Sequence, residues 1–158
     1  MSTEQLALVV ALVAVFFGPL VQLSIANKQI RVATRSTNRQ DWINALRDEI
    51  SEFLGHIANL DFMLELKDNE PYDEIDEDID ELGQALYYHY YKVQLLINPE
   101  EKDHEELHEK MNAIENVLWE EKMGKKKRAE RLSELMAELT GISQRVLKRE
   151  WKRVKKGD

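Results

Sequence analysis

Residues 43–64 read INALRDEISEFLGHIANLDFML, and apolar side chains recur within them at gaps of three and four. This spacing places one apolar face along an α-helix. The members of this first stripe are Ile43, Leu46, Ile50, Phe53, Ile57, Leu60 and Leu64. The helix is expected to begin near Thr37, because Thr37-x-x-Gln40 has the spacing of a capping box, or to continue directly from the preceding residues.

Three further stripes with the same spacing follow along the chain. They consist of Ile75, Ile79, Leu82, Leu86, His89, Val93 and Leu96; of Leu107, Met111, Ile114 and Leu118; and of Leu132, Leu135, Leu139, Ile142 and Val146. Asn98 is expected to cap the third helix, with Pro99 at its first position. The polar stretch 124–128 predicts either a turn or a wet stretch in one long helix. The predicted fold is all-α, an antiparallel bundle of about four long, coiled-coil-like amphipathic helices.

An uncharged apolar run, LALVVALVAVFFGPLVQLSI, occupies residues 6–25. Its length matches the roughly 30 Å core of a bilayer, so residues 1–27 are predicted to be a transmembrane anchor and residues 28–158 a cytosolic helical bundle with a basic C-terminal tail. A cleaved signal peptide is the alternative, although such peptides have a shorter apolar run and a basic N-terminus. Because basic residues follow the run and none precede it, we expect a single-pass bacterial inner-membrane protein with its N-terminus outside and its C-terminal domain in the cytoplasm.

Small residues form a stripe inside the apolar run. It consists of Ala7, Ala11, Ala14 and Gly18, with Gln22 on the same face. Such a face lets helices approach closely or lines a pore, although alanine is also common in apolar helices in general. Pro19 predicts a kink. Since each chain has one such helix, the stripe predicts a homo-oligomer.

The chain has a net charge of −8, but its charges are distributed unevenly. Acidic residues gather over 68–81 and are expected to dock a basic protein partner. Basic residues that follow the apolar run and basic residues of the C-terminal tail are expected to contact membrane lipid headgroups. They are Lys28, Arg31, Arg35, Arg39, Lys152, Arg153, Lys155 and Lys156. Folding back near residue 126 would also bring the acidic face Glu101, Glu105 and Glu109 opposite the basic face Arg145, Lys148, Arg149 and Lys152. The negative net charge argues against nucleic acid as a partner.

The string His104-Glu105-Glu106-Leu107-His108 satisfies H-E-x-x-H, the spacing that places two zinc ligands and a general base on one helix face. Charged residues surround the string, and no strand is predicted that could bind a substrate. We therefore interpret it as fortuitous, a counter-charge to the last helix, and name His104 and His108 only as candidate metal ligands. The chain has no cysteine and no glycine-rich phosphate loop, so we expect no cofactor and no enzymatic activity.

Residues 87–91 read YYHYY and place aromatic rings around more than one turn of the second helix. Burial on several sides, for instance between subunits, is one interpretation of this pattern. Packing within the bundle with the outward tyrosines exposed is the other. His89 lies on the core stripe and is expected to be a hydrogen-bonded core histidine.

Residues 38–47, NRQDWINALR, resemble a segment of the form NRQ-x-WI-x-x-LR in a group of uncharacterised small bacterial and prophage-type membrane proteins. In those proteins the segment follows an N-terminal span. The resemblance covers the apolar run and about thirty residues after it, and it implies a membrane-tethered helical protein of unknown activity. Physically, Trp42, Ile43 and Leu46 can fill a core, while Arg39 and Arg47 lie near headgroups or subunit carboxylates.

These features predict a membrane-anchored, homo-oligomeric helical protein. The main hypothesis is a pore-forming or membrane-perturbing effector of prophage or defence type, possessing an ion channel gated by its cytosolic domain. The first alternative is a tethered scaffold or adaptor that docks a basic partner at its acidic end. The second alternative is an H-E-x-x-H zinc hydrolase.

Overall fold

The computed structural model describes residues 2–69, 73–120 and 122–156, apart from the side chains of residues 4, 6–14, 16, 68, 69, 73 and 74. Within these ranges the chain forms four α-helices and no strand. They are α1 (Thr3–Asn69), α2 (Asp73–Leu96), α3 (Lys102–Leu118) and α4 (Lys125–Lys156). The prediction of an all-α helical bundle is confirmed.

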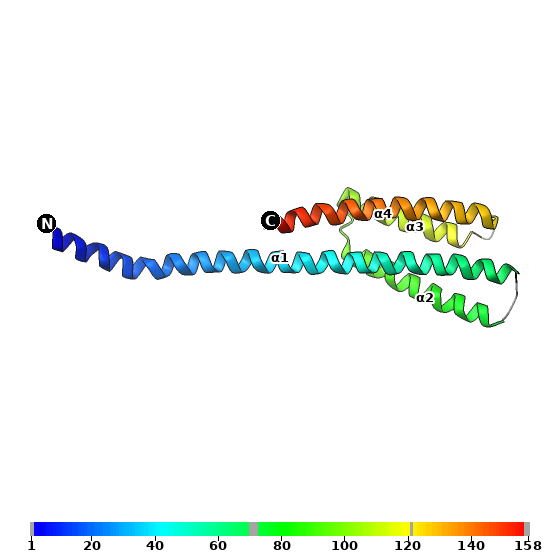
Figure 1. The fold of residues 1–158 in the computed structure, drawn as a ribbon, viewed down its shortest axis with the longest axis horizontal. Coiled ribbons are helices and arrows are strands. Elements are labelled where there is room, and N and C mark those ends of the chain that lie inside the picture. The colour runs from blue at the N-terminus through cyan, green and yellow to red at the C-terminus, as the bar shows by residue number, and fades with distance from the viewer. Residues whose placement is uncertain (1, 70–72, 121, 157–158) are drawn as a thin grey trace.

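Successive helices run in opposite directions (Figure 1). α1 packs against α2 and α4, and α3 packs against α4. The first half of α1 projects beyond the other three helices, and the end of α4 lies beside the middle of α1 (Figure 1). We call residues 3–36 the arm and residues 37–156 the bundle.

The four apolar stripes meet in one core. Every stripe residue is buried except five that are half-buried, namely Leu64, Ile75, Leu82, His89 and Leu96. Complete burial of one leucine or isoleucine side chain contributes about 1.5–3 kcal/mol. Because all four helices contribute such side chains, burial of this shared core stabilises the bundle.

α1 is longer than the capping-box pattern at Thr37 indicated. Thr37 lies inside the helix, and the reciprocal cap occurs instead at the start of α1. There the Ser2 hydroxyl accepts from the backbone N–H of Gln5 at 3.3 Å, and the Gln5 side-chain oxygen accepts from the backbone N–H of Ser2 at 3.1 Å. Pro19 lies within α1, and the blue part of the helix that contains it is bent relative to the rest (Figure 1).

The connections differ from the predictions at one place and agree at another. Glu101 caps α3, so the prediction of Asn98 as the cap and Pro99 as the first helical residue is wrong. The reason is that Asn98 stabilises the preceding loop, where its side-chain oxygen accepts from the backbone N–H of Glu100 at 3.1 Å. α3 ends at Leu118 and α4 begins at Lys125, so the polar stretch 124–128 separates two helices.

No helix in the described part of the chain is both long and apolar enough to cross a membrane. This finding contradicts the predicted single-pass inner-membrane location with an outer N-terminus and a cytoplasmic C-terminal domain.

Candidate functional site

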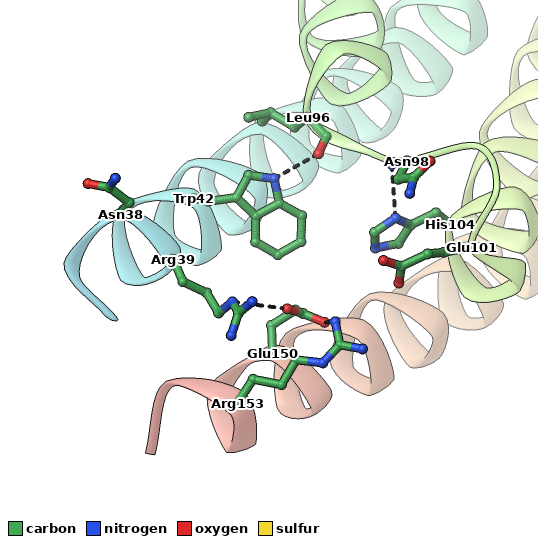
Figure 2. A pocket seen from close by; sticks show the side chains of 9 residues that line it. All are labelled: Asn38, Arg39, Trp42, Leu96, Asn98, Glu101, His104, Glu150 and Arg153. Carbon is green, nitrogen blue, oxygen red and sulfur yellow. Dashed lines mark hydrogen bonds and ion pairs between the residues drawn. The ribbon is translucent and has the colours of Figure 1, made fainter. Parts of the chain in front are cut away.

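A polar junction closes the end of the bundle beside the arm (Figure 2). Trp42 of α1, the α2–α3 connection and Glu150 of α4 surround a pocket of about 360 Å³ there. The Trp42 indole N–H donates to the backbone carbonyl of Leu96 at 2.7 Å, and its ring centroid lies 6.0 Å from that of His104. Trp42 therefore joins α1 to the end of α2 and to the start of α3.

Glu150 is a nearly buried charge in this junction, with 5% of its surface exposed. Its Oε1 accepts from Arg153 Nη1 at 2.9 Å and from Arg149 Nε at 3.1 Å, while Oε2 lies 3.6 Å from Arg39 Nε. Arg39 and Arg153, two of the residues expected at lipid headgroups, converge on this carboxylate (Figure 2). Glu150 thus connects α4 to the part of α1 where the arm meets the bundle.

Acidic residues at the start of α3 lie opposite basic residues of α4, as predicted in outline, but only the pair of Glu101 and Arg149 belongs to both predicted faces. Arg149 bridges to Glu101 and, at 3.0 Å, to Asp103. Arg145 pairs with Glu106 at 2.8 Å, not with Glu105 or Glu109 as the register from the sequence indicated.

Both histidines of the H-E-x-x-H string form hydrogen bonds inside the bundle. The backbone N–H of Asn98 donates to Nδ1 of His104 at 3.0 Å, so the neutral ring carries its proton on Nε2. His108 Nε2 lies 3.0 Å from the side-chain nitrogen of Asn112, whose oxygen accepts from the Tyr90 hydroxyl at 2.5 Å. The string therefore stabilises the α2–α3 connection and α3 itself through one ring nitrogen of each histidine. The other two nitrogens, His104 Nε2 and His108 Nδ1, are buried without a hydrogen-bond partner among the described residues.

A second group of polar residues, the histidine cluster, lies between α1 and α2. It consists of Glu52 and His56 on α1 and His89 on α2, whose potential ligand atoms all lie within 4.8 Å of one another. The two imidazole rings stack with their centroids 5.2 Å apart. This is the one group of three or more potential metal ligands within the described residues.

Glu49 supports the histidine cluster from the next turn of α1. Its Oε2 lies 2.7 Å from His89 Nδ1, and its Oε1 forms an ion pair with Lys92. Burial raises the pKa of the Glu49 carboxyl, but the hydrogen bonds from Lys92 and His89 outweigh it, so the net pKa is lowered. Glu49 is therefore an ionised acceptor at neutral pH that holds the ring of His89 in one orientation.

The sequence contains one local signal for this cluster. Glu52 and His56 are four residues apart, so they lie on the same face of α1. His89 belongs to the apolar stripe of α2 and was therefore interpreted as a core residue. Bringing the three together requires the register of α1 against α2, which no local pattern contains.

Two of the four tyrosines in residues 87–91 point into the bundle, and two point outward. The Tyr87 hydroxyl donates to Glu115 at 2.7 Å, and this hydrogen bond, followed by burial, raises the pKa of Tyr87. Burial also raises the pKa of Tyr90. Tyr88 and Tyr91 are exposed. This arrangement matches the interpretation of packing within the bundle with outward tyrosines exposed.

An acidic groove lies between α1 and α2, near the end of the bundle that is farthest from the arm. It has a volume of about 470 Å³ and an apolar floor that includes Phe62, Met63 and Leu82. Asp78 and Glu81 stand at its edge, and both are exposed. Phe62 is itself 59% exposed, which is unusual for a large aromatic side chain without a partner.

The arm carries several apolar side chains that are more than half exposed. They are Val15, Phe17, Leu20, Val21, Leu23, Ile25 and Ile30. Of the small-residue stripe, Gly18 is half-buried and Gln22 is exposed, whereas the side chains of Ala7, Ala11 and Ala14 lie outside the described part. The remaining basic residues expected at headgroups, Lys28, Arg31, Arg35, Lys152, Lys155 and Lys156, are all exposed.

No family model, curated protein or solved structure matches this chain. The functional argument therefore rests on the geometry of the arm, the acidic groove and the histidine cluster.

Proposed function

We propose that this chain is a self-assembling helical scaffold, in which the arm joins copies of the chain and holds their bundles beside one another. The observation that carries this proposal is the exposed apolar surface of the arm. Monomeric proteins rarely expose a contiguous apolar patch larger than a few hundred Å², and larger patches are typical of interaction surfaces.

The face of α1 that forms the bundle core continues into the arm with the same spacing. From Ile43 toward the N-terminus, gaps of three and four lead through Arg39 and then to Ser36, Val32, Gln29 and Ile25. Inside the bundle this face is covered by α2 and α4. In the arm it lines an open groove of about 770 Å³, whose other wall is Val154, Lys155 and Lys156 at the end of α4.

The arm of a second copy is the occupant that this groove fits best. Apolar residues at gaps of three and four pack best against a helix with the same repeat, as in a coiled coil. Gln22, Gln29 and Ser36 interrupt the apolar face, and in a parallel pair each glutamine would meet the same amide of its partner and hydrogen-bond to it. The pore and gating hypothesis depended on a membrane location, so we do not carry it forward.

The proposal is tested by measuring the mass of the full chain with light scattering after gel filtration. We expect a mass that is a multiple of 18.5 kDa for the natural sequence and a shift toward 18.5 kDa for Ile25→Glu. Ile30→Glu is the matched control, because Ile30 is also exposed but lies on the opposite side of α1.

Three results would contradict the proposal. The first is a natural chain that is monomeric at tens of micromolar. The second is equal dissociation by Ile25→Glu and Ile30→Glu. The third is a chain that floats with lipid vesicles as a monomer, since lipid and not a second arm would then cover the apolar face.

The acidic groove favours a second function, docking of a partner segment on the assembled scaffold. Its apolar floor and carboxylate edge match an amphipathic helix that has basic residues beside an apolar anchor. Phe62 would contribute the apolar contact, and Asp78 and Glu81 would pair with the basic residues. We therefore propose that the bundle acts as an adaptor for such a helix.

Docking is tested by the fluorescence anisotropy of a labelled amphipathic peptide made of leucine and lysine. We expect binding that weakens with salt and falls at least about tenfold when Asp78 and Glu81 are both replaced by lysine. Replacing the exposed Glu130 and Glu134 of α4 by lysine gives a control with the same change in net charge. Equal binding by the two double variants would reject the adaptor function.

A further inference from the structure

The histidine cluster contains a ligand set that the scaffold and adaptor functions do not use. Glu52 and His56 project from the same face of α1, and His89 faces them from α2. His56 Nδ1 is buried and has no hydrogen-bond partner within the described part of the chain. A buried polar atom without a partner costs about 1–3 kcal/mol, so its presence between two potential ligands needs an explanation.

Glu49 determines which nitrogen of His89 is free to bind a ligand. A carboxylate can only accept, so the 2.7 Å contact with Glu49 Oε2 places the proton of the neutral ring on Nδ1. The lone pair is then on Nε2. Metal-bound histidines generally have this arrangement, in which a carboxylate accepts from one ring nitrogen and the metal binds the other. Lys92 holds Glu49 in place from α2.

We infer that Glu52, His56 and His89 form a binding site for a divalent transition-metal ion, with Glu49 as the carboxylate that orients His89. Two imidazoles and one carboxylate are a usual zinc ligand set, and three protein ligands leave a fourth position for water. Imidazole ligands favour zinc and its neighbours over magnesium and calcium, which prefer oxygen.

The geometry requires only a small rearrangement to close around an ion. With bonds of about 2.0–2.1 Å, the ligand atoms of a tetrahedral zinc site lie about 3.4 Å apart. The present atoms lie within 4.8 Å of one another. Glu52 is exposed and can rotate toward the two histidines without disturbing the core. Because the ligands come from both helices, the bound ion would clamp α1 against α2.

The site is tested by dialysing the full chain against Zn(II) and measuring the bound metal by mass spectrometry. We expect about one zinc per chain, a higher melting temperature with zinc, and a cobalt form with the visible spectrum of a tetrahedral site. Affinity should fall by at least about tenfold in His56→Ala and His89→Ala, and by about 10–100-fold in Glu49→Gln. Mg(II) should not compete.

His108→Ala is the matched control. His108 is also a half-buried helical histidine, but it does not belong to the group formed by Glu52, His56 and His89, so its replacement should leave zinc affinity unchanged. If a histidine variant fails to fold by circular dichroism, the exposed Glu52→Gln takes its place, and it too should lose at least about fivefold in affinity. The site lies within one chain, so Ile25→Glu should bind zinc as well as the natural sequence does.

Three results would overturn the inference. The first is the absence of stoichiometric zinc at neutral pH from the natural chain. The second is a loss of affinity in His108→Ala as large as that in His56→Ala. The third is an unchanged affinity in both Glu49→Gln and Glu52→Gln. Each of these results leaves the self-assembly proposal intact, because the arm contributes no ligand.

Discussion

Replacing Glu150 with alanine removes the carboxylate on which three arginines converge at the junction of arm and bundle. Two of its contacts, to Arg153 and Arg149, are within hydrogen-bond distance at 2.9 and 3.1 Å. A hydrogen bond to a charged group contributes about 1.5–3 kcal/mol. The three arginine side chains are between 30% and 44% exposed and can turn toward water, so the loss should fall below the 3–5 kcal/mol of a fully buried broken pair. We expect Glu150→Ala to lower the free energy of unfolding by about 2–3 kcal/mol.

The assay is urea unfolding followed by circular dichroism at one fixed protein concentration, since assembly adds to apparent stability. Glu138→Ala on the same helix is the control. Glu138 pairs with Lys110 at 2.6 Å, but its side chain is 48% exposed, so its loss should cost much less than that of Glu150. Hydrogen exchange should also accelerate at the end of α4 in Glu150→Ala. A cost no larger than that of Glu138→Ala would refute the stabilising role assigned to Glu150.

Two further predictions concern the core and the tyrosines. Leu139→Ala should cost about 2–5 kcal/mol in urea unfolding because Leu139 is fully buried, whereas Leu95→Ala, at a residue 86% exposed, should change little; equal costs would contradict the assigned core. Tyr87→Phe should cost about 1 kcal/mol at pH 7. The raised pKa of Tyr87 means that its contribution is present below the unfolded pKa of about 10 and is lost as the pH rises through the folded pKa, so the difference between Tyr87→Phe and the natural chain should shrink above pH 10. The exposed Tyr88→Phe should show neither effect, and a Tyr87→Phe cost that persists unchanged at alkaline pH would contradict the hydrogen bond to Glu115.

The core could be predicted from the sequence because burial follows a local rule. Gaps of three and four place Leu46, Phe53, Leu107 and Leu139 on helix faces, and any antiparallel arrangement of those faces buries them. The extent of α1 was less predictable. The capping pattern predicted a helix start near Thr37, whereas the uninterrupted run of helix-compatible residues before it allowed the helix to start earlier. The structure has the earlier start.

The candidate sites could not be predicted because they depend on register between helices. Glu150 lies in a basic segment beside Arg149 and Arg153 of the same helix, and only the placement of α4 against α1 shows that Arg39 also lies near it. His89 looked like a core residue until α1 placed Glu52 and His56 opposite it. The membrane location was predicted from the composition of residues 6–25. It is wrong because no helix in the described part of the chain is both long and apolar enough to cross a membrane.

Cross-linking through single cysteines tests self-assembly most directly, because the chain has no cysteine of its own. A disulfide forms where two Cβ atoms come within about 3.5–4.5 Å. Pairing along the continued core face predicts rapid covalent dimers under mild oxidation for Ile25→Cys and Val32→Cys, and slow ones for Ile30→Cys on the opposite side. Equal rates at all three positions, or dimers at none of them, would contradict assembly through the arm.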